Sequence, residues 1–230
     1  MSDRPTRIVL VDDQTLVRSG MKALLEAEPD LHVTGEASDG AEGVELALTR
    51  RPDVVLMDVE MPVLDGIEAI RRIKAAGSKA HILIVTDDDD EQVVLRALRA
   101  GANGFFLKDA APARLVEAVR IVATGDTLLA PPVARRLVDA LLSHTHPMLK
   151  RRFEPLTERE RDIVRHLAMG RSNAVVAQEL SLSEGTVKTH VTRLLTKLGV
   201  RSRVQAVVLA YESGFVRPGH TDATAITGGR

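Results

Sequence analysis

Residues 54–66 read VVLMDVEMPVLDG, and this stretch decides the fold that we expect. Its first four residues are apolar throughout, as in a strand of a parallel sheet that is covered on both faces. The strand ends at Asp58, and a capping box, Asp65-Gly66-Ile67-Glu68, then predicts a helix start. The stretch therefore predicts one unit of an α/β fold, in which a strand, a loop and a helix follow one another.

The same alternation runs through the first half of the chain. Short apolar runs rich in Val, Ile and Phe predict strands at 8–11, 31–37, 54–57, 82–85 and 104–107. The segments between them carry apolar residues at helical spacing and predict helices at 15–27, 41–49, 66–76, 92–100 and 112–123. Five successive βα units indicate a flavodoxin-like, doubly wound α/β domain over residues 6–125.

The chain changes character after residue 125. We interpret residues 126–155 as a linker with one short helix, at 133–142. Residues 156–216 predict an all-α domain, because a capping residue precedes each of four short helical patterns. These capping residues are Thr157, Ser172, Ser183 and Ser202. Residues 217–230 are rich in Gly, Thr and Ala, and we expect them to be disordered.

Charge divides the chain at the same place. Residues 1–125 hold 15 Lys+Arg and 22 Asp+Glu, a net charge of −7, whereas residues 126–230 carry +6, so the whole chain carries −1. The chain has no Cys, which excludes disulfides, thiolate metal sites and a Cys nucleophile. No run approaches the roughly 18 apolar residues of a membrane span, and a signal-peptide core is lacking. We expect a cytoplasmic protein of two modules, the basic one facing nucleic acid.

Polar residues follow four of the predicted strands. Asp12 and Asp13 follow the first strand, Asp58 the third, Thr86 ends the fourth and Lys108 follows the fifth. The carboxyl ends of parallel strands share one edge of the sheet, so these side chains should converge there. Three carboxylates packed together repel one another unless a cation lies among them, and Mg²⁺ accepts such ligands.

A carboxylate can also be a nucleophile towards phosphorus. We therefore expect Asp58 to accept a phosphoryl group, with Asp12 and Asp13 as metal ligands. Lys108 would neutralise the incoming oxygens, and the Thr86 hydroxyl would hydrogen-bond one of them.

These residues and their context resemble a bacterial response-regulator receiver domain. The resemblance is carried by Val11-Asp12-Asp13, by residues 57–66, by Thr86 and by residues 101–108, which read GANGFFLK. It implies that a histidine kinase donates phosphate to Asp58, and that the backbone carbonyl of Glu60 joins Asp12, Asp13 and Asp58 around Mg²⁺. It also implies that Thr86 and Phe105 form a switch pair, in which the ring turns inward when Thr86 moves towards the phosphoryl group.

An acidic run, Asp87-Asp88-Asp89-Asp90-Glu91, lies beside this site. At the start of this run, relatives more often carry Thr and an aromatic residue. A solvated loop that caps the next helix would explain it. The alternative hypothesis is that Asp88 and Glu60 flank the phosphoryl group and alter its hydrolysis.

The segment 183–198 is amphipathic, with Val187, Val191, Leu194, Leu195 and Leu198 on one side. Its other side exposes Lys and Thr and suits the major groove of DNA. Leu156-Thr157-Glu158-Arg159-Glu160 and residues 182–199 resemble the helix-turn-helix domain of the NarL/FixJ (LuxR-type) subfamily. The resemblance implies that Lys188, Thr189 and Thr192, with His190 beside them, face bases, and that Arg193 and Lys197 meet phosphates, together with Ser183 or Thr186.

The last helix, 202–213, resembles the dimerisation helix of this subfamily. Its candidate contacts are Val204, Val207, Val208 and Tyr211, although packing against the recognition helix would use the same residues.

We therefore expect a transcription regulator of a two-component system, which binds a double-stranded operator as a homodimer when Asp58 is phosphorylated. RNA polymerase would be a further partner. We expect no enzyme activity beyond the formation and hydrolysis of the aspartyl-phosphate. Two alternatives stay open. One is a DNA-binding regulator that does not depend on phosphorylation. The other is a Mg²⁺-dependent phosphatase, because Asp58 and Glu60 loosely resemble the motif of haloacid-dehalogenase-type phosphatases, which use an Asp nucleophile.

Overall fold

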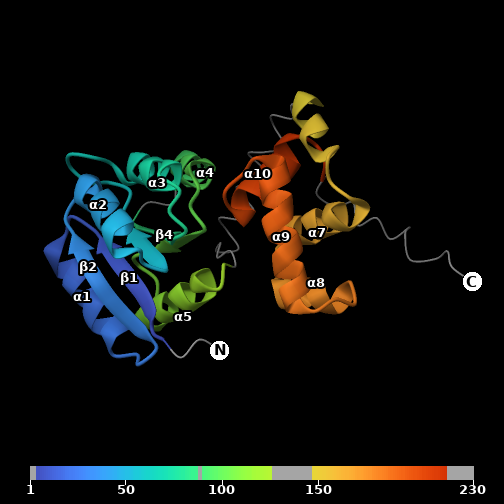
Figure 1. The fold of residues 1–230 in the computed structure, drawn as a ribbon. Coiled ribbons are helices and arrows are strands. Elements are labelled where there is room, and N and C mark those ends of the chain that lie inside the picture. Colours follow the sequence, from blue (N-terminus) through green and yellow to red (C-terminus); the bar gives the residue numbers. More distant parts are fainter. Residues whose placement is uncertain (1–3, 88–89, 126–146, 217–230) are drawn as a thin grey trace, which may run out of the picture.

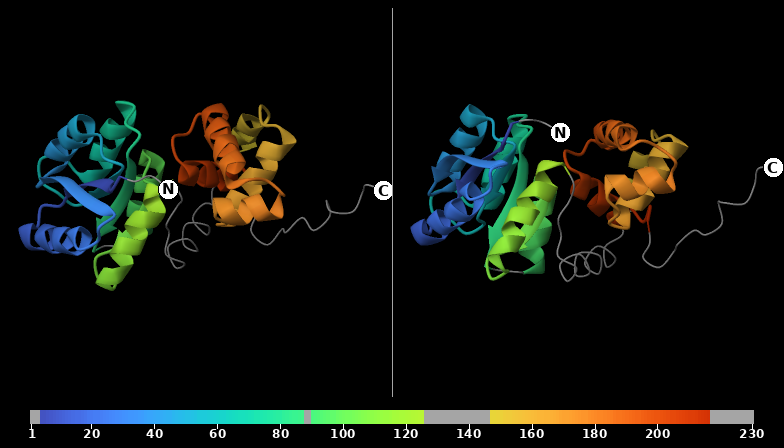
Figure 2. Two further views of the ribbon diagram at one scale, coloured as in Figure 1. Left: turned by 60° about the horizontal axis from the view of Figure 1, so that its bottom comes forward. Right: turned by 90° about the horizontal axis from the view of Figure 1, so that it is seen from below.

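The computed structural model describes residues 4–87, 90–125 and 147–216. These residues form two bodies, one with a central sheet and one built only from helices (Figures 1 and 2). The helix expected at 133–142 and the tail 217–230 lie outside the described residues. No helix in the described part of the chain is both long and apolar enough to span a membrane.

The first body is a five-stranded parallel sheet with the strand order β2-β1-β3-β4-β5. The strands are β1 (Thr6–Val11), β2 (Leu31–Ala37), β3 (Val54–Met57), β4 (His81–Thr86) and β5 (Gly104–Leu107). The helices are α1 (Thr15–Glu26), α2 (Gly40–Arg50), α3 (Gly66–Ala75), α4 (Glu91–Ala100) and α5 (Pro112–Ala123). The predicted flavodoxin-like fold is confirmed.

Alternate residues of each strand point to opposite faces of this sheet, and each face has its own core. Val9 and Val11 of β1 pack with residues of α2, α3 and α4, whereas Ile8 and Leu10 pack with residues of α1 and α5. Both faces are therefore covered, which explains why the central strands are apolar throughout.

The second body contains a 3₁₀ helix, η1 (Pro147–Phe153), and four α-helices. These are α7 (Glu158–Ala168), α8 (Asn173–Glu179), α9 (Glu184–Leu198) and α10 (Arg203–Glu212). The side chains of Thr157, Ser172, Ser183 and Ser202 each accept a hydrogen bond from a backbone N–H of the helix that follows. The four predicted helix starts are therefore confirmed, and each is stabilised by a cap of the expected kind.

The two bodies touch through α4 and α10, which lie side by side (Figure 1). Val204, Val208 and Tyr211 of α10 are buried in the same apolar cluster as residues of α4. The sequence Ser202-Arg203-Val204-Gln205 predicts a capping box, but the side chain of Gln205 does not close one with Ser202. Instead its Oε1 accepts a hydrogen bond from Arg201 N, and its Nε2 donates to Arg99 O of α4 at 2.7 Å.

Candidate functional site

Three carboxylates meet at the carboxyl ends of β1 and β3. Oxygen atoms of Asp12, Asp13 and Asp58 all lie within 4.8 Å of one another. Asp12 and Asp58 are buried, whereas Asp13 is exposed. The neighbouring strands β1 and β3 pair in register from Ile8 with Val54 to Val11 with Met57, so the acidic residues that follow them necessarily come together.

Lys108 joins two of these carboxylates. Its Nζ lies 2.7 Å from Asp58 Oδ2 and 2.9 Å from Asp12 Oδ2, and its side chain is almost fully buried. Burial raises the pKa of Asp58, and the neighbouring Asp12 charge raises it further, while Lys108 opposes both effects. Burial by itself would lower the pKa of Lys108, but its bonds to Asp58 and Asp12 raise it overall. The site therefore concentrates one buried cation and several carboxylates at a single point.

The loop after Asp58 is held by its own backbone. Asp58 Oδ1 accepts a hydrogen bond from Val59 N at 2.7 Å, and Gly66 N donates to Val59 O at 2.9 Å. A Cβ atom at residue 66 would lie 1.9 Å from Asp58 O, so only glycine fits there. We interpreted Gly66 from the sequence only as part of a helix cap, and its close approach to Asp58 was missed because no local pattern reports it.

Thr86 and Phe105 lie on adjacent strands, where β4 and β5 pair Ile84 with Phe105 and Thr86 with Leu107. Both Thr86 and Phe105 are only 2% exposed, and the Phe105 ring belongs to the core on the α4 side of the sheet. In this structure the ring is therefore already packed inward.

These residues fit a magnesium ion. Asp12 Oδ2 is buried and pairs with the Lys108 ammonium, and no other described residue bonds it. A hard divalent cation prefers carboxylate oxygens and tolerates waters in its remaining positions, and the exposed Asp13 leaves such positions open to solvent. The cluster is thus a candidate metal centre beside Asp58. Glu60, whose carbonyl the resemblance adds to this set, is an exposed residue of the same loop.

The acidic run that follows β4 divides into residues of different environments. Asp87 lies 3.8 Å from Lys108 through its Oδ2, and its side chain is 70% exposed. Asp90 is the N-cap of α4 and accepts a hydrogen bond from Gln92 N at 2.6 Å. Asp88 lies outside the described residues. At least one member of the run, Asp87, thus reaches the site itself.

Helix α9 presents a polar face on the second body. Lys188, Thr189, Thr192, Arg193 and Lys197 are exposed on it, as the sequence predicts. The hydroxyl groups of Thr189 and Thr192 donate to the backbone carbonyls of Gly185 and Lys188, one turn earlier. His190 is half-buried, and its buried Nδ1 has no hydrogen-bond partner among the described residues.

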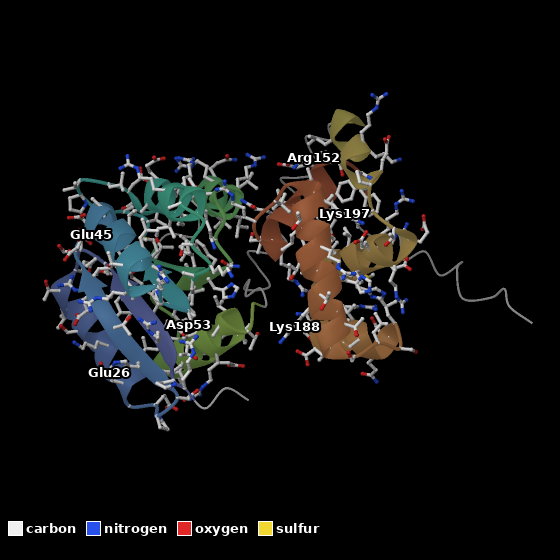
Figure 3. The ribbon with its side chains drawn as sticks, viewed as in Figure 1. Glu26, Glu45, Asp53, Arg152, Lys188 and Lys197 are labelled. Atoms are coloured by element: carbon white, nitrogen blue, oxygen red, sulfur yellow. The ribbon has the colours of Figure 1, made fainter. Side chains whose placement is uncertain are left out.

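Lys188 and Lys197 lie in different surroundings on α9 (Figure 3). Lys188 projects from the helix and pairs with Glu184 at 3.3 Å. Lys197 donates to Glu160 Oε2 at 2.7 Å, and Glu160 is only 3% exposed. Near Lys197, Arg152 of η1 donates to Leu198 O at the end of α9. Of the two lysines, Lys188 is therefore the one with a surface partner, whereas Lys197 neutralises a buried carboxylate.

The residues that the sequence suggested for dimerisation face the first body in this structure. Val204, Val208 and Tyr211 are buried against the α4 side, and Val207 is partly buried between the two bodies. The ion pair between Arg99 and Glu212 and the hydrogen bond from Gln205 to Arg99 O surround this apolar contact.

Comparisons with known proteins identify both bodies. Residues 8–120 match a family described as the response regulator receiver domain, and residues 154–210 match the bacterial regulatory proteins of the luxR family. The chain is 40% identical over 220 residues to the uncharacterized transcriptional regulatory protein YxjL of Bacillus subtilis (strain 168), covering 94% of this chain and 100% of YxjL. It is 35% identical to the nitrate/nitrite response regulator protein NarL of Escherichia coli (strain K12), covering 92% and 97% of the two chains.

A solved structure agrees with this result. The response regulator ChrA of a heme-sensing two-component system is 37% identical, with a TM-score of 0.51, over 92% of this chain and 99% of ChrA. The fold, the site and these similarities define a two-component response regulator with a DNA-binding output domain. The chain belongs to the NarL/FixJ subfamily, whose output domain is of the LuxR type.

Proposed function

We propose that this regulator accepts a phosphoryl group on Asp58 from a histidine kinase, and that phosphorylation controls its dimerisation and its binding to an operator in double-stranded DNA. The observation that carries the proposal is the contact of Lys108 Nζ with both Asp58 and Asp12 beside the exposed Asp13. It combines a nucleophile, a buried cation and two further carboxylates, which is the set that in-line phosphoryl transfer requires.

In the proposed reaction an oxygen of Asp58 attacks phosphorus, the O–P bond forms and the bond from phosphorus to the kinase histidine breaks. Lys108 exchanges Asp58 Oδ2 for an oxygen of the phosphoryl group, while it keeps Asp12. The Thr86 hydroxyl then bonds a second phosphoryl oxygen and forms the switch pair with Phe105. Mg²⁺, held by Asp12, Asp13, Asp58 and the Glu60 carbonyl, would supply charge neutralisation in the transition state.

The contact between α4 and α10 supports a link from this site to dimerisation. The side chains that we propose for the dimer, Val204, Val207, Val208 and Tyr211, cannot contact a second copy while α4 covers them. A shift of the receiver towards its phosphorylated state would free α10. The extent of this population shift depends on the relative stability of the two states.

We further propose that residues 6–125 act as a receiver domain and residues 156–216 as a DNA-binding domain, joined by residues 126–155, of which η1 packs on the second body. Lys188, Thr189 and Thr192 would contact bases, with His190 beside them, and Arg193 and Lys197 would contact phosphates. As a transcription regulator the protein would act in the cytoplasm, where its DNA lies, with RNA polymerase as a further partner, and would have no enzyme activity beyond its own aspartyl-phosphate.

Genome-wide DNA binding of the wild type and of Asp58→Asn tests the proposal. The wild type should occupy its operators more strongly when the cell supplies phosphodonor, and Asp58→Asn should not respond. Identical occupancy would favour the second candidate, a regulator that does not depend on phosphorylation. The observation that supports this candidate is the negative charge of Asp87 beside Lys108, because Lys108 then has an acidic partner there without a phosphoryl group. Turnover of a free phosphoester by the purified protein would instead support a phosphatase.

A further inference from the structure

Asp87 is a fourth carboxylate at the phosphorylation site. It follows Thr86 directly, and its Oδ2 lies 3.8 Å from Nζ of Lys108, which already contacts Asp58 at 2.7 Å and Asp12 at 2.9 Å. The backbone hydrogen bond from Lys108 N to Thr86 O, at 2.9 Å, holds the ends of β4 and β5 together. The paired strand ends therefore bring the residue that follows Thr86 close to Lys108.

The position of Asp87 differs from that of the metal-ligating candidates. Among the described residues, Asp12, Asp13 and Asp58 form the cluster of three acidic groups that could hold a metal ion, and Asp87 is not part of it. Its side chain is 70% exposed, whereas the Lys108 side chain is 8% exposed. Asp87 thus places a solvent-exposed carboxylate beside the buried Lys108, which also contacts Asp58.

A negative charge at this position opposes the incoming group in two ways. It repels the oxygens of a free phosphodonor, and it attracts the ammonium that those oxygens need. Neither effect requires that Asp87 touch the metal or the acceptor. A donor attached to a protein can offset the repulsion with binding energy from elsewhere on its surface, whereas a small free anion cannot.

We propose that Asp87 is a specificity-determining residue, which hinders phosphorylation of Asp58 by small anionic phosphodonors and so restricts the site to donors that dock on the protein. The proposal rests on the proposed function of Asp58.

The test compares the rate of phosphorylation of the full-length wild type and Asp87→Asn by acetyl phosphate in the presence of Mg²⁺. Asparagine keeps the shape of the side chain and removes its charge. Because Asp87 is exposed, the variant should fold like the wild type. We expect Asp87→Asn to react about tenfold faster at low salt, because a dianion is repelled by one nearby charge less. Equal rates, or a failure of both proteins to react, would overturn the proposal.

Two further measurements separate electrostatic repulsion by Asp87 from steric hindrance of the phosphodonor. The gain should shrink as the salt concentration rises, and it should be smaller with phosphoramidate, which carries less net negative charge than acetyl phosphate. A gain that is independent of both salt and donor charge would overturn the electrostatic role. Asp90→Asn is the matched control, because it removes an equal charge from the same acidic run and keeps a residue that can cap α4; it should change the rate less than twofold.

The outcome for Asp58 itself is read in the same experiment. If the site of phosphorylation in both proteins is not Asp58, as Asp58→Asn would reveal by reacting normally, the proposed function fails. If Asp58 is the acceptor and Asp87→Asn gives no gain, only the present inference fails.

Discussion

Arg99 of α4 and Glu212 of α10 form an ion pair between the two domains, with 2.5 Å between Nη2 and Oε1. The Arg99 side chain is half-exposed, so the pair by itself contributes less than about 1 kcal/mol to the contact. The apolar residues Val204, Val208 and Tyr211 behind it contribute the larger share. We call the arrangement in which α4 contacts α10 closed. Its stability can be changed at Arg99 or Glu212 without disturbing the core of either domain.

Reversal of one charge in this pair should open the molecule. Arg99→Glu sets two carboxylates against each other and should shift the equilibrium between closed and separated domains by about 1 kcal/mol towards separation. Small-angle scattering should then give a larger radius of gyration than for the wild type. The double variant Arg99→Glu/Glu212→Arg restores opposite charges and should be compact again; a double variant as extended as the single one would show that the ion pair has no part in the contact.

Magnesium should stabilise the receiver domain through the exposed Asp13. At a Mg²⁺ concentration of 100 times Kd, binding should raise the free energy of unfolding by about 2.7 kcal/mol. Asp13→Asn should bind Mg²⁺ at least tenfold more weakly in calorimetry, with little change in stability when the metal is removed by a chelator. The control is Glu45→Gln, an exposed acid on α2. Unchanged Mg²⁺ affinity in Asp13→Asn would remove Asp13 from the proposed metal ligands.

Arg193 and Lys197 should both contribute to DNA binding but should differ in their effects on stability. Arg193 is exposed and has no ion-pair partner in the described part of the chain, so Arg193→Ala should lower the slope of log affinity against log salt concentration by about one. Lys197 pairs with the buried Glu160, so Lys197→Ala should cost about 1–3 kcal/mol of stability. Denaturation curves and salt titrations on an operator fragment separate the two effects. An unchanged slope in a folded Lys197→Ala would remove Lys197 from the proposed phosphate contacts.

Two glycines provide a matched pair for the backbone around Asp58. Alanine at Gly66 brings Cβ against the carbonyl oxygen of Asp58, so Gly66→Ala should displace the loop, cost about 1–3 kcal/mol and slow phosphorylation. Gly20 in α1 has no heavy atom within 4 Å of such a Cβ. Gly20→Ala should therefore stabilise the protein by about 0.5–1 kcal/mol and leave phosphorylation unchanged. Thermal denaturation and phosphorylation rates check both variants; a stable and fully active Gly66→Ala would contradict the close approach.

Lys74 should make stability rise with pH above neutrality. Burial lowers the pKa of Lys74 to about 8, and the charge of Arg201 contributes. Between this value and the ordinary pKa near 10.5 the unfolded chain holds more protons than the folded one, so the free energy of unfolding increases as pH rises. We expect the wild type to gain about 2 kcal/mol over Lys74→Met between pH 7.5 and 9.5, measured by chemical denaturation.

In the folded protein Lys74 Nζ donates to Ala80 O at 2.7 Å, and Lys74→Met leaves that carbonyl without this donor at every pH. The comparison therefore depends on the change of the difference with pH and not on its size at one pH. Parallel stability profiles of the two proteins would contradict the lowered pKa.

The order of the elements and the convergence of Asp12, Asp13, Asp58 and Lys108 could be predicted from the sequence. Strands and helices follow local periodicity and capping residues, which a short window contains. Convergence then follows from a rule of topology, since parallel strands carry their following residues to one edge of the sheet. No measurement of distance was needed for either step.

Other relationships were decided only by the tertiary structure. The apolar face of α10 has the same pattern whether a second copy or the receiver covers it, and only packing shows that α4 lies on Val208 and Tyr211. Lys197 is predicted to lie on the exposed side of an amphipathic helix, and it does, but only the structure shows that its ammonium pairs with the buried Glu160 of α7. The reason is common to these cases: periodicity determines which side of an element is apolar or charged, whereas the partner of that side comes from a distant part of the chain and depends on how whole elements pack.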